Sequence, residues 1–310
     1  MEKILITPRS ITKEGGHPSL EKLRQAGFEV IFSSPGIQPD ESELLRLLPG
    51  CVGYLAGVEQ ISENVLKAAK GLRIISRNGV GNNNIDLEAA KRLNIEICIT
   101  PGANSRGVAE LTISLVFALA LQIHFTDATL KAGKWDRKIG FEIKGKTLGI
   151  IGFGRIGKEV ALMAMALGMK VIAFDLYPPG FFTYSDNFKM APFHEVIKNA
   201  DILSLHCPVP ANKEALIDAS AIMLMKQGTC LINTARGELL NDNDVIEALN
   251  SNKLSGVAVD VFVKEPPAGR GLIDDPKVIS TSHIGGFTVE SVERAVDDAV
   301  VNILKTLQKQ

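Results

Sequence analysis

Short apolar runs alternate with amphipathic runs along the first hundred residues. The runs typical of strands lie at 4–7, 29–32, 52–55, 72–76 and 95–99, and those typical of helices lie between them at 19–26, 42–48, 62–69 and 86–93. Strands that alternate with helices predict a parallel sheet covered by helices on both faces. The first hundred residues are therefore expected to form one doubly wound domain.

A second series of the same kind follows a long apolar stretch. Pro101 and Gly102 interrupt the first series, and a single long helix is expected over 106–124. The next strands are expected at 147–152, 171–174, 202–205, 230–233, 257–261 and 278–280, with helices that include 157–167 and 242–249. The last helix, 288–307, has no strand after it, so the pattern alone allows it to return to either domain.

Length and composition narrow the class of protein. The 310 residues suggest about two domains. A net charge of −1, with 45% hydrophobic and 22% charged residues, favours a globular protein and gives no field that attracts nucleic acid or anionic lipid. The apolar run Leu111 to Leu121 is too short to span a membrane. Four scattered cysteines and an N-terminus without a signal-peptide pattern predict a reduced, cytoplasmic location.

A glycine-rich segment carries the clearest chemical signal. The spacing Gly152-x-Gly154-x-x-Gly157 follows a strand and opens a helix, and a second strand then ends at Asp175. The glycines permit a tight turn and close approach of a pyrophosphate, to which Arg155 and Ile156 present backbone amides at the start of the helix. An acidic residue at this distance accepts hydrogen bonds from an adenosine ribose. We therefore predict a Rossmann domain that binds NAD in preference to NADP.

Three further polar residues follow strands in the same half of the chain. Arg236, Glu265 and His283 each lie just beyond a predicted strand, and carboxyl ends of parallel strands line the ligand crevice. Arginine binds a carboxylate with two parallel donors, and histidine beside a carboxylate is suited to proton transfer near neutral pH. Taken one by one, each is more often a cap, a turn residue or a polar strand end. Together they favour hydride transfer to a 2-oxo acid.

These motifs resemble the D-isomer-specific 2-hydroxyacid dehydrogenases, and most closely the phosphoglycerate dehydrogenase branch. The resemblance covers nearly the whole chain. It rests on the glycine loop and on the segments 78–86, 104–111, 205–208, 233–237, 260–267 and 283–286.

The resemblance implies a fold and a set of roles. It implies a flavodoxin-like substrate domain, 1–101 completed by 284–310, a Rossmann NAD-binding domain, 102–283, a cleft between the two domains, and a homodimer supported by the long helix. Arg236, Glu265 and His283 would be catalytic, and Asp260 would bind the nicotinamide carboxamide. Other residues implied to contact the cofactor are Val80, His206, Cys207, Pro208, Thr234, Ala235, Gly285 and Gly286. The substrate would be held by the loop that contains Asn78 and Gly79.

The identity of the acid stays open at this point. The segment Ala56 to Glu59 lacks the arginine with which some relatives bind the phosphate of the substrate. Arg9 and Arg77 are the nearby cations that would have to replace it. A D-3-phosphoglycerate dehydrogenase-like activity, reduction of glyoxylate or hydroxypyruvate, and a non-catalytic NAD(H)-sensing role are the alternatives. The histidines His17, His124, His194 and His206 show no metal-ligand spacing, and no metal is expected. The chain ends without the regulatory extension of many such enzymes, so feedback by serine is not expected.

Overall fold

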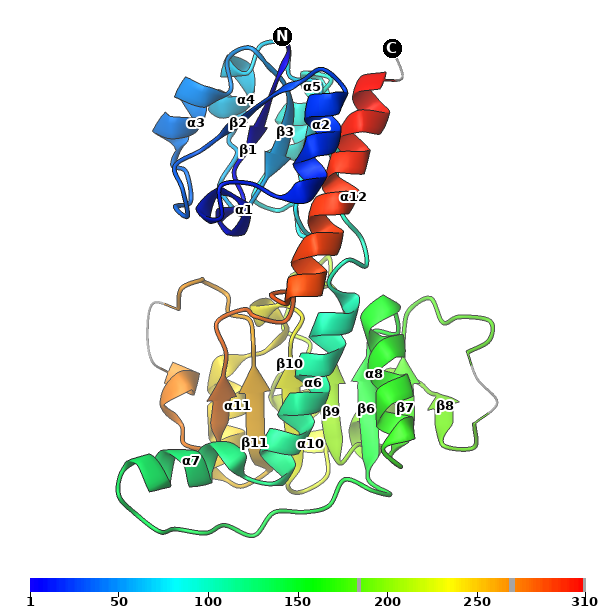
Figure 1. Cartoon of the computed structure of the whole chain (residues 1–310). Helices are drawn as coiled ribbons and strands as arrows, with labels where there is room; N and C mark the ends of the chain where they lie inside the picture. The colour runs from blue at the N-terminus through cyan, green and yellow to red at the C-terminus, as the bar shows by residue number, and fades with distance from the viewer. Residues whose placement is uncertain (183–184, 268–270, 309–310) are drawn as a thin grey trace. The chain divides into compact units, whose positions relative to one another are not determined.

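A computed structural model describes residues 1–182, 185–267 and 271–308 of the chain. It divides into two compact units, residues 1–104 with 288–310 and residues 105–287. These boundaries lie a few residues after the expected ones, because the helices α6 (Ser105–Ala120) and α12 (Val289–Gln308) begin there. In the described chain every paired strand is parallel, and the α/β fold with two parallel sheets is confirmed (Figure 1).

The smaller unit contains a five-stranded sheet in the order β2-β1-β3-β4-β5. This is the flavodoxin-like order, in which the chain reverses direction across the sheet between β1 and β3. The strands are β1 (Lys3–Ile6), β2 (Glu29–Phe32), β3 (Cys51–Ala56), β4 (Ile74–Arg77) and β5 (Glu96–Cys98). The helices before α12 are α1 (Arg9–Lys13), α2 (Glu21–Gln25), α3 (Glu41–Leu47), α4 (Glu63–Ala68) and α5 (Leu87–Arg92), and a 3-10 turn at Pro18–Leu20 precedes α2.

Short polar side chains begin several of these helices. Asp40, Ser62 and Asp86 accept hydrogen bonds from backbone amides in the first turns of α3, α4 and α5. Such caps satisfy amides that have no partner within the helix. They are the reason why these helices start where the sequence pattern places them.

The larger unit contains a seven-stranded sheet in the order β12-β11-β10-β9-β6-β7-β8. Its first six strands along the chain have the Rossmann order. They are β6 (Thr147–Ile151), β7 (Lys170–Phe174), β8 (Phe188–Met190), β9 (Ile202–Leu205), β10 (Thr229–Asn233) and β11 (Leu254–Val259), and β12 (Val278–Ser280) extends the sheet. The helices besides α6 are α7 (Ile123–Lys131), α8 (Arg155–Ala166), α9 (Phe193–Asn199), α10 (Ala219–Leu224) and α11 (Asp242–Asn250). The sequence pattern did not predict the short strand β8.

Apolar side chains cover both faces of each sheet. On β10, Leu231 packs on one face, while Cys230 and Ile232 pack on the other. On β1, Leu5 and its neighbours Ile4 and Ile6 divide in the same way. Continuous apolar strands are typical of parallel sheets that have helices on both sides.

The long helix expected over 106–124 is interrupted. Helix α6 ends at Ala120, and α7 starts at Ile123 with an axis 67° away. Gln122 has a left-handed backbone, with φ of 56°, and its side-chain amide donates to the Leu119 carbonyl oxygen at 2.8 Å. The expectation of one helix was wrong, because a single left-handed residue within an apolar run leaves no periodic signal. Within the described residues no single helix meets the length and hydropathy of a membrane span, although α6 and α7 taken together do.

The final helix α12 belongs to the smaller unit. Its buried face, which includes Val296, Val300 and Ile303, packs in one cluster with Ile4 of β1 and Leu55 of β3. Residues from the two ends of the chain therefore complete one core.

Replacing Ile303 by Ala should lower the free energy of unfolding of the smaller unit by about 2–5 kcal/mol, because it removes a fully buried side chain and leaves a cavity. Urea titration followed by circular dichroism measures the change. Lys305→Ala, on the exposed side of the same helix, is the control. Equal stability of the two variants would contradict the assignment of this face to the core.

Candidate active site

The predicted site residues of the larger unit follow the carboxyl ends of its strands. Gly152 follows β6, Asp175 follows β7, and the segment 206–208 follows β9. Residues 234–236 follow β10, Asp260 follows β11, and the segment 283–286 lies beyond β12. Because all the strands are parallel, these loops lie along one edge of the sheet.

The glycine loop has the geometry of a nucleotide-binding turn. Gly152 has φ of 95°, and a Cβ there would lie 2.5 Å from the carbonyl carbon of His206. A Cβ at Gly157 would lie 2.3 Å from the carbonyl oxygen of Gly152, so only glycine lets α8 pack this closely on the loop. At Gly154 a Cβ would meet no atom within 4 Å, so the backbone here has open space beside it. Arg155 and Ile156 open helix α8, whose amino end favours an anion.

Asp175 is fixed by backbone amides. One carboxylate oxygen accepts from the Phe153 amide at 2.6 Å, and the other accepts from the Tyr177 amide at 2.8 Å. These bonds connect the end of β7 to the glycine loop. A carboxylate oxygen can accept more than one hydrogen bond, so the predicted contact with a ribose is compatible with this arrangement.

His206 and Cys207 border the glycine loop from β9. Burial lowers the pKa of His206 to about 3 and raises the pKa of the Cys207 thiol to about 11. His206 Nε2 lies 2.9 Å from the Ser204 hydroxyl, while buried Nδ1 has no partner among the described residues. Both side chains are therefore neutral near pH 7, and Cys207 lacks the thiolate character of a nucleophile.

Glu265 and His283 form a hydrogen-bonded pair. His283 Nδ1 lies 2.7 Å from one oxygen of Glu265, and the other oxygen accepts from the Phe262 amide at 3.1 Å. Both side chains are partly exposed, with 51% of His283 and 38% of Glu265 accessible. The contact fixes the ring through Nδ1, so Nε2 is the nitrogen presented for proton exchange.

Asp260 holds the loop that carries His283. Its buried carboxylate accepts from the Thr281 hydroxyl at 2.6 Å, from the Ile284 amide at 2.8 Å and from the Gly285 amide at 2.9 Å. Between these anchors His283 adopts a left-handed backbone with φ of 56°. The structure thus shows a positioning role that the sequence analysis did not assign to Asp260, while its predicted contact with the carboxamide stays a prediction.

Arg236 is positioned by the residues that precede it. Its Nη1 donates to the Ala235 carbonyl oxygen at 2.6 Å. Asn233 accepts from the Ala235 amide at 3.0 Å and donates to the Arg236 carbonyl oxygen at 2.8 Å. Asn233 was missed as a functional residue, although an asparagine at a strand end followed by a turn is a recognisable signal. Thr234 contacts Thr112 of α6 through a 3.2 Å hydroxyl pair.

The remaining predicted residues lie in the smaller unit. Arg9 is exposed at the start of α1, just beyond β1. Arg77 ends β4 and is buried, and Asn78 and Gly79 follow it in a loop that exposes Val80. They share the carboxyl edge of the five-stranded sheet.

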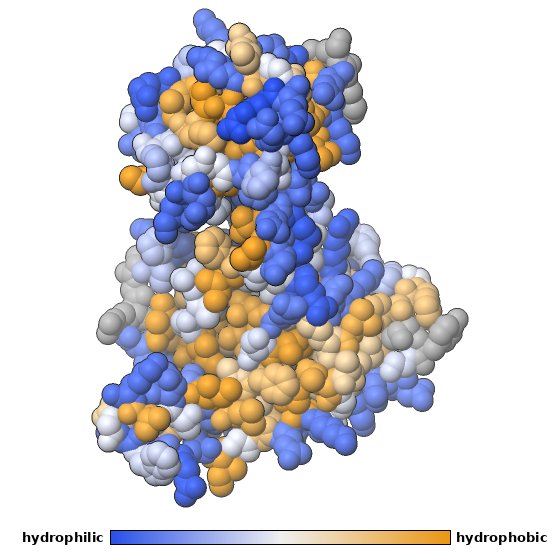
Figure 2. Space-filling view, viewed as in Figure 1, coloured by the Kyte–Doolittle hydropathy of each residue, from blue (hydrophilic) through white to orange (hydrophobic). Residues whose placement is uncertain are grey.

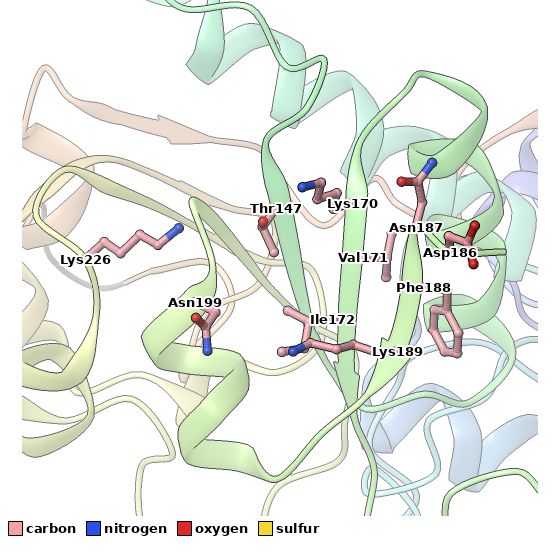
Figure 3. Close-up of a pocket in the computed structure, with 10 residues that line it drawn as sticks. All are labelled: Thr147, Lys170, Val171, Ile172, Asp186, Asn187, Phe188, Lys189, Asn199 and Lys226. Carbon is pink, nitrogen blue, oxygen red and sulfur yellow. The ribbon is translucent and has the colours of Figure 1, made fainter.

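A cavity of about 270 Å³ opens at the other edge of the seven-stranded sheet (Figure 3). It lies near the amino ends of β6 and β7, with Thr147, Lys170 and Lys226 in its lining. None of the predicted site residues lines it. It is therefore separate from the edge that carries the glycine loop.

Comparisons with known proteins agree with this geometry. Residues 113–285 match the NAD binding domain of the D-isomer specific 2-hydroxyacid dehydrogenases. The chain is 36% identical over 274 residues to a hydroxypyruvate reductase of Thermotoga maritima, covering 86% of this chain and 89% of that one. It is 35% identical over 290 residues to a D-3-phosphoglycerate dehydrogenase of Pongo abelii, covering 93% of this chain and 54% of that one. The chain thus spans about half the length of this dehydrogenase.

Solved structures show the same fold along the whole chain. A Thermus thermophilus protein, TT0316, has a TM-score of 0.88 at 33% identity, covering 99% of this chain and 97% of that one. A glyoxylate reductase from Paecilomyes thermophila has a TM-score of 0.84 at 26% identity, covering 99% and 96%.

The chain therefore belongs to the D-isomer specific 2-hydroxyacid dehydrogenase family, as its motifs predicted. Its larger unit is the NAD-binding domain of that family, which confirms NAD as the cofactor expected from the glycine loop and Asp175.

His206, whose ring nitrogen Nδ1 is buried, should make stability depend on pH. Below pH 6.5, its ordinary pKa, the unfolded chain takes up a proton, whereas the folded protein does so only near pH 3. The free energy of unfolding should therefore fall as the pH decreases through this range, by up to about 1.4 kcal/mol per pH unit from this group. Urea titrations at about pH 7 and about pH 5 measure the slope. His206→Asn should lack this contribution and the exposed His194→Asn should keep it, whereas equal slopes would refute the assignment.

Proposed function

We propose that the protein is an NAD-dependent dehydrogenase that interconverts a small D-2-hydroxy acid and its 2-oxo acid. The observation that carries this proposal is the hydrogen-bonded pair of Glu265 and His283. Arg236 follows β10, the neighbour of β11 in the same sheet, and so lies along the same edge. A cation for a carboxylate and a proton donor for an alkoxide are the two groups that this reaction requires. Bound NADH supplies the hydride that reduces C2.

Each residue of this set has a defined task. The guanidinium of Arg236, already oriented by the Ala235 carbonyl oxygen, binds the carboxylate of the substrate. In the direction of reduction, protonated His283 donates the Nε2 proton to the carbonyl oxygen of the substrate. A carboxylate oxygen of Glu265 accepts a hydrogen bond from His283 Nδ1, which stabilises the charged ring before transfer and holds its orientation afterwards. The reverse reaction uses the same atoms with His283 as the base.

The nucleotide is held by the larger unit. The amides at the start of α8 and the open space beside Gly154 fit a pyrophosphate, and Asp175 fits an adenosine ribose. Thr234, Ala235 and the segment Gly285–Gly286 are proposed to line the nicotinamide end. These assignments follow the order of the loops along the sheet edge.

We further propose that the protein acts as a homodimer. Apolar side chains gather on the face of the larger unit that carries α6 and α7 (Figure 2). The exposed large apolar side chains of residues 121–139, which include α7, are Leu121, Ile123, Leu130, Trp135 and Ile139. Ile139 is 99% accessible. Large apolar side chains that are exposed and gather on one face are typical of an interface.

Replacing Ile139 by Asp should shift the protein from two chains to one in sedimentation velocity, because a charge would be desolvated in the interface. Leu176→Asp, at an exposed apolar position elsewhere in the larger unit, should leave the mass unchanged. A wild-type protein that sediments as one chain would exclude the dimer.

The proposed chemistry predicts the effect of removing the histidine. His283→Ala should lower kcat for reduction of 2-oxo acids by about 10² or more while NADH affinity, measured by fluorescence titration, changes little. The exposed His194→Ala is the matched control. Turnover of His283→Ala close to that of the wild type would show that another group moves the proton.

A further inference from the structure

A buried polar cluster lies at the carboxyl edge of the five-stranded sheet. Its members are Thr7 just after β1, Tyr54 on β3, Glu59 in the loop after β3, and Arg77 at the end of β4, and all four are buried. The strand order places β1 beside β3, where the chain reverses direction across the sheet. Ligands of open α/β sheets bind outside the carboxyl ends of the strands at this switch point. The cluster therefore lies where this unit is built to meet a ligand.

Glu59 is held as a carboxylate acceptor. One oxygen accepts from the Tyr54 hydroxyl at 2.5 Å, from the Gly57 amide at 2.9 Å, and from the Thr7 hydroxyl. The backbone oxygen of Glu59 accepts from Asn84 at 2.6 Å, and only 1% of the residue is accessible. Burial, and secondarily the charge of Glu59, raises the pKa of Tyr54, so this hydroxyl remains a neutral donor. Donors surround the oxygen as they do an ionised carboxylate.

Arg77 lies beneath the loop that is expected to hold the substrate. Its Nη1 donates to the Asn78 carbonyl oxygen at 2.7 Å, and a Cβ at Gly79 would lie 3.2 Å from the same nitrogen. Its Nε is buried with no hydrogen-bond partner in the described part of the chain. Burial lowers the pKa of Arg77, and the negative charge of Glu59 acts in the opposite direction. In the sheet register Arg77 lies opposite Ala56, three residues before Glu59, so the two buried charges lie in one cluster and offset each other through space.

The buried charge of Glu59 decides what this edge of the sheet can bind. Without Glu59, a buried guanidinium with a free Nε beneath Asn78 and Gly79 would attract an anion. With Glu59, the cluster has no net charge. A phosphate dianion that approaches the cluster is repelled by the carboxylate of Glu59 about as strongly as it is attracted by the guanidinium of Arg77. Like charges in a poorly solvated site are strongly disfavoured. The other cation at this edge, Arg9, is exposed and screened by solvent.

We propose that Glu59 neutralises Arg77 and thereby makes the protein select unphosphorylated 2-oxo acids over phosphorylated ones. The inference rests on the dehydrogenase activity proposed above. It assigns Glu59 as a specificity-determining residue, and it assigns Arg77 to the support of the Asn78 loop in place of phosphate binding.

The test compares two substrates that differ by one phosphate group. The ratio of kcat/KM for hydroxypyruvate to that for phosphohydroxypyruvate is measured from NADH oxidation in the wild type, Glu59→Gln and the control Glu63→Gln. Glu59→Gln keeps the size and the acceptor oxygen but removes the charge. Glu63→Gln makes the same charge change on α4 of the same unit, at a side chain that is 42% accessible.

The wild type and Glu63→Gln should prefer hydroxypyruvate by about tenfold or more, and Glu59→Gln should move the ratio toward the phosphorylated acid by about tenfold or more. Adding Arg77→Met to Glu59→Gln should cancel that shift. A wild type that prefers phosphohydroxypyruvate, or a Glu59→Gln ratio equal to that of the wild type, overturns the proposal.

A second measurement separates this proposal from the proposed activity. Inorganic phosphate is titrated calorimetrically into the same proteins, and Glu59→Gln should bind it about tenfold more tightly than Glu63→Gln does. If the wild type reduces neither of these substrates nor any other small 2-oxo acid, the proposed activity fails. The phosphate titration still decides the role of Glu59, since equal affinities overturn that role. If circular dichroism shows that Glu59→Gln is unfolded, the substrate preference of the wild type decides, and preference for the phosphorylated acid overturns the proposal.

Discussion

Parallel pairing of strands is the constraint on which the site depends. A parallel strand must return through a connection on the face of the sheet, so all strands of one sheet end at the same edge. In the larger unit this brings together loops that are far apart in the sequence, from Gly152 to the segment 283–286. In the smaller unit it brings Thr7, Glu59 and Arg77 into one cluster. In both units the functional side chains are thus brought together at the carboxyl edge of the sheet, and no single loop supplies them all.

The sequence predicted those parts of the site that depend on local backbone geometry. The glycine loop is recognisable because a tight turn and close helix packing exclude a side chain at Gly152 and Gly157. The alternation of strands and helices likewise predicted the fold class, because each element buries its own apolar face. The break at Gln122 escaped prediction, since a left-handed residue has no periodic signature.

The parts that depend on long-range contacts were not predictable in this way. Glu59 follows a strand as many solvated glutamates do, and only its contacts with Thr7 and Tyr54 show that it is buried. Asp260 was assigned to the cofactor, yet its bonds to the 281–285 loop become visible only when β11 and β12 are placed side by side. Charge and hydrogen-bond geometry at such positions are set by neighbours that the linear pattern does not identify.

The discontinuous smaller unit has a consequence for how the chain folds during synthesis. Residues 1–104 leave the ribosome well before α12, the helix that covers the apolar face formed by Ile4, Leu55 and Ile74. The larger unit is continuous in sequence, and domains fold as units while the chain emerges. The five-stranded sheet therefore keeps one apolar face uncovered until the intervening larger unit and α12 have been made. Residues 1–104 emerge before the larger unit but complete their core after it, so their uncovered apolar face is open to aggregation or chaperone binding in the nascent chain.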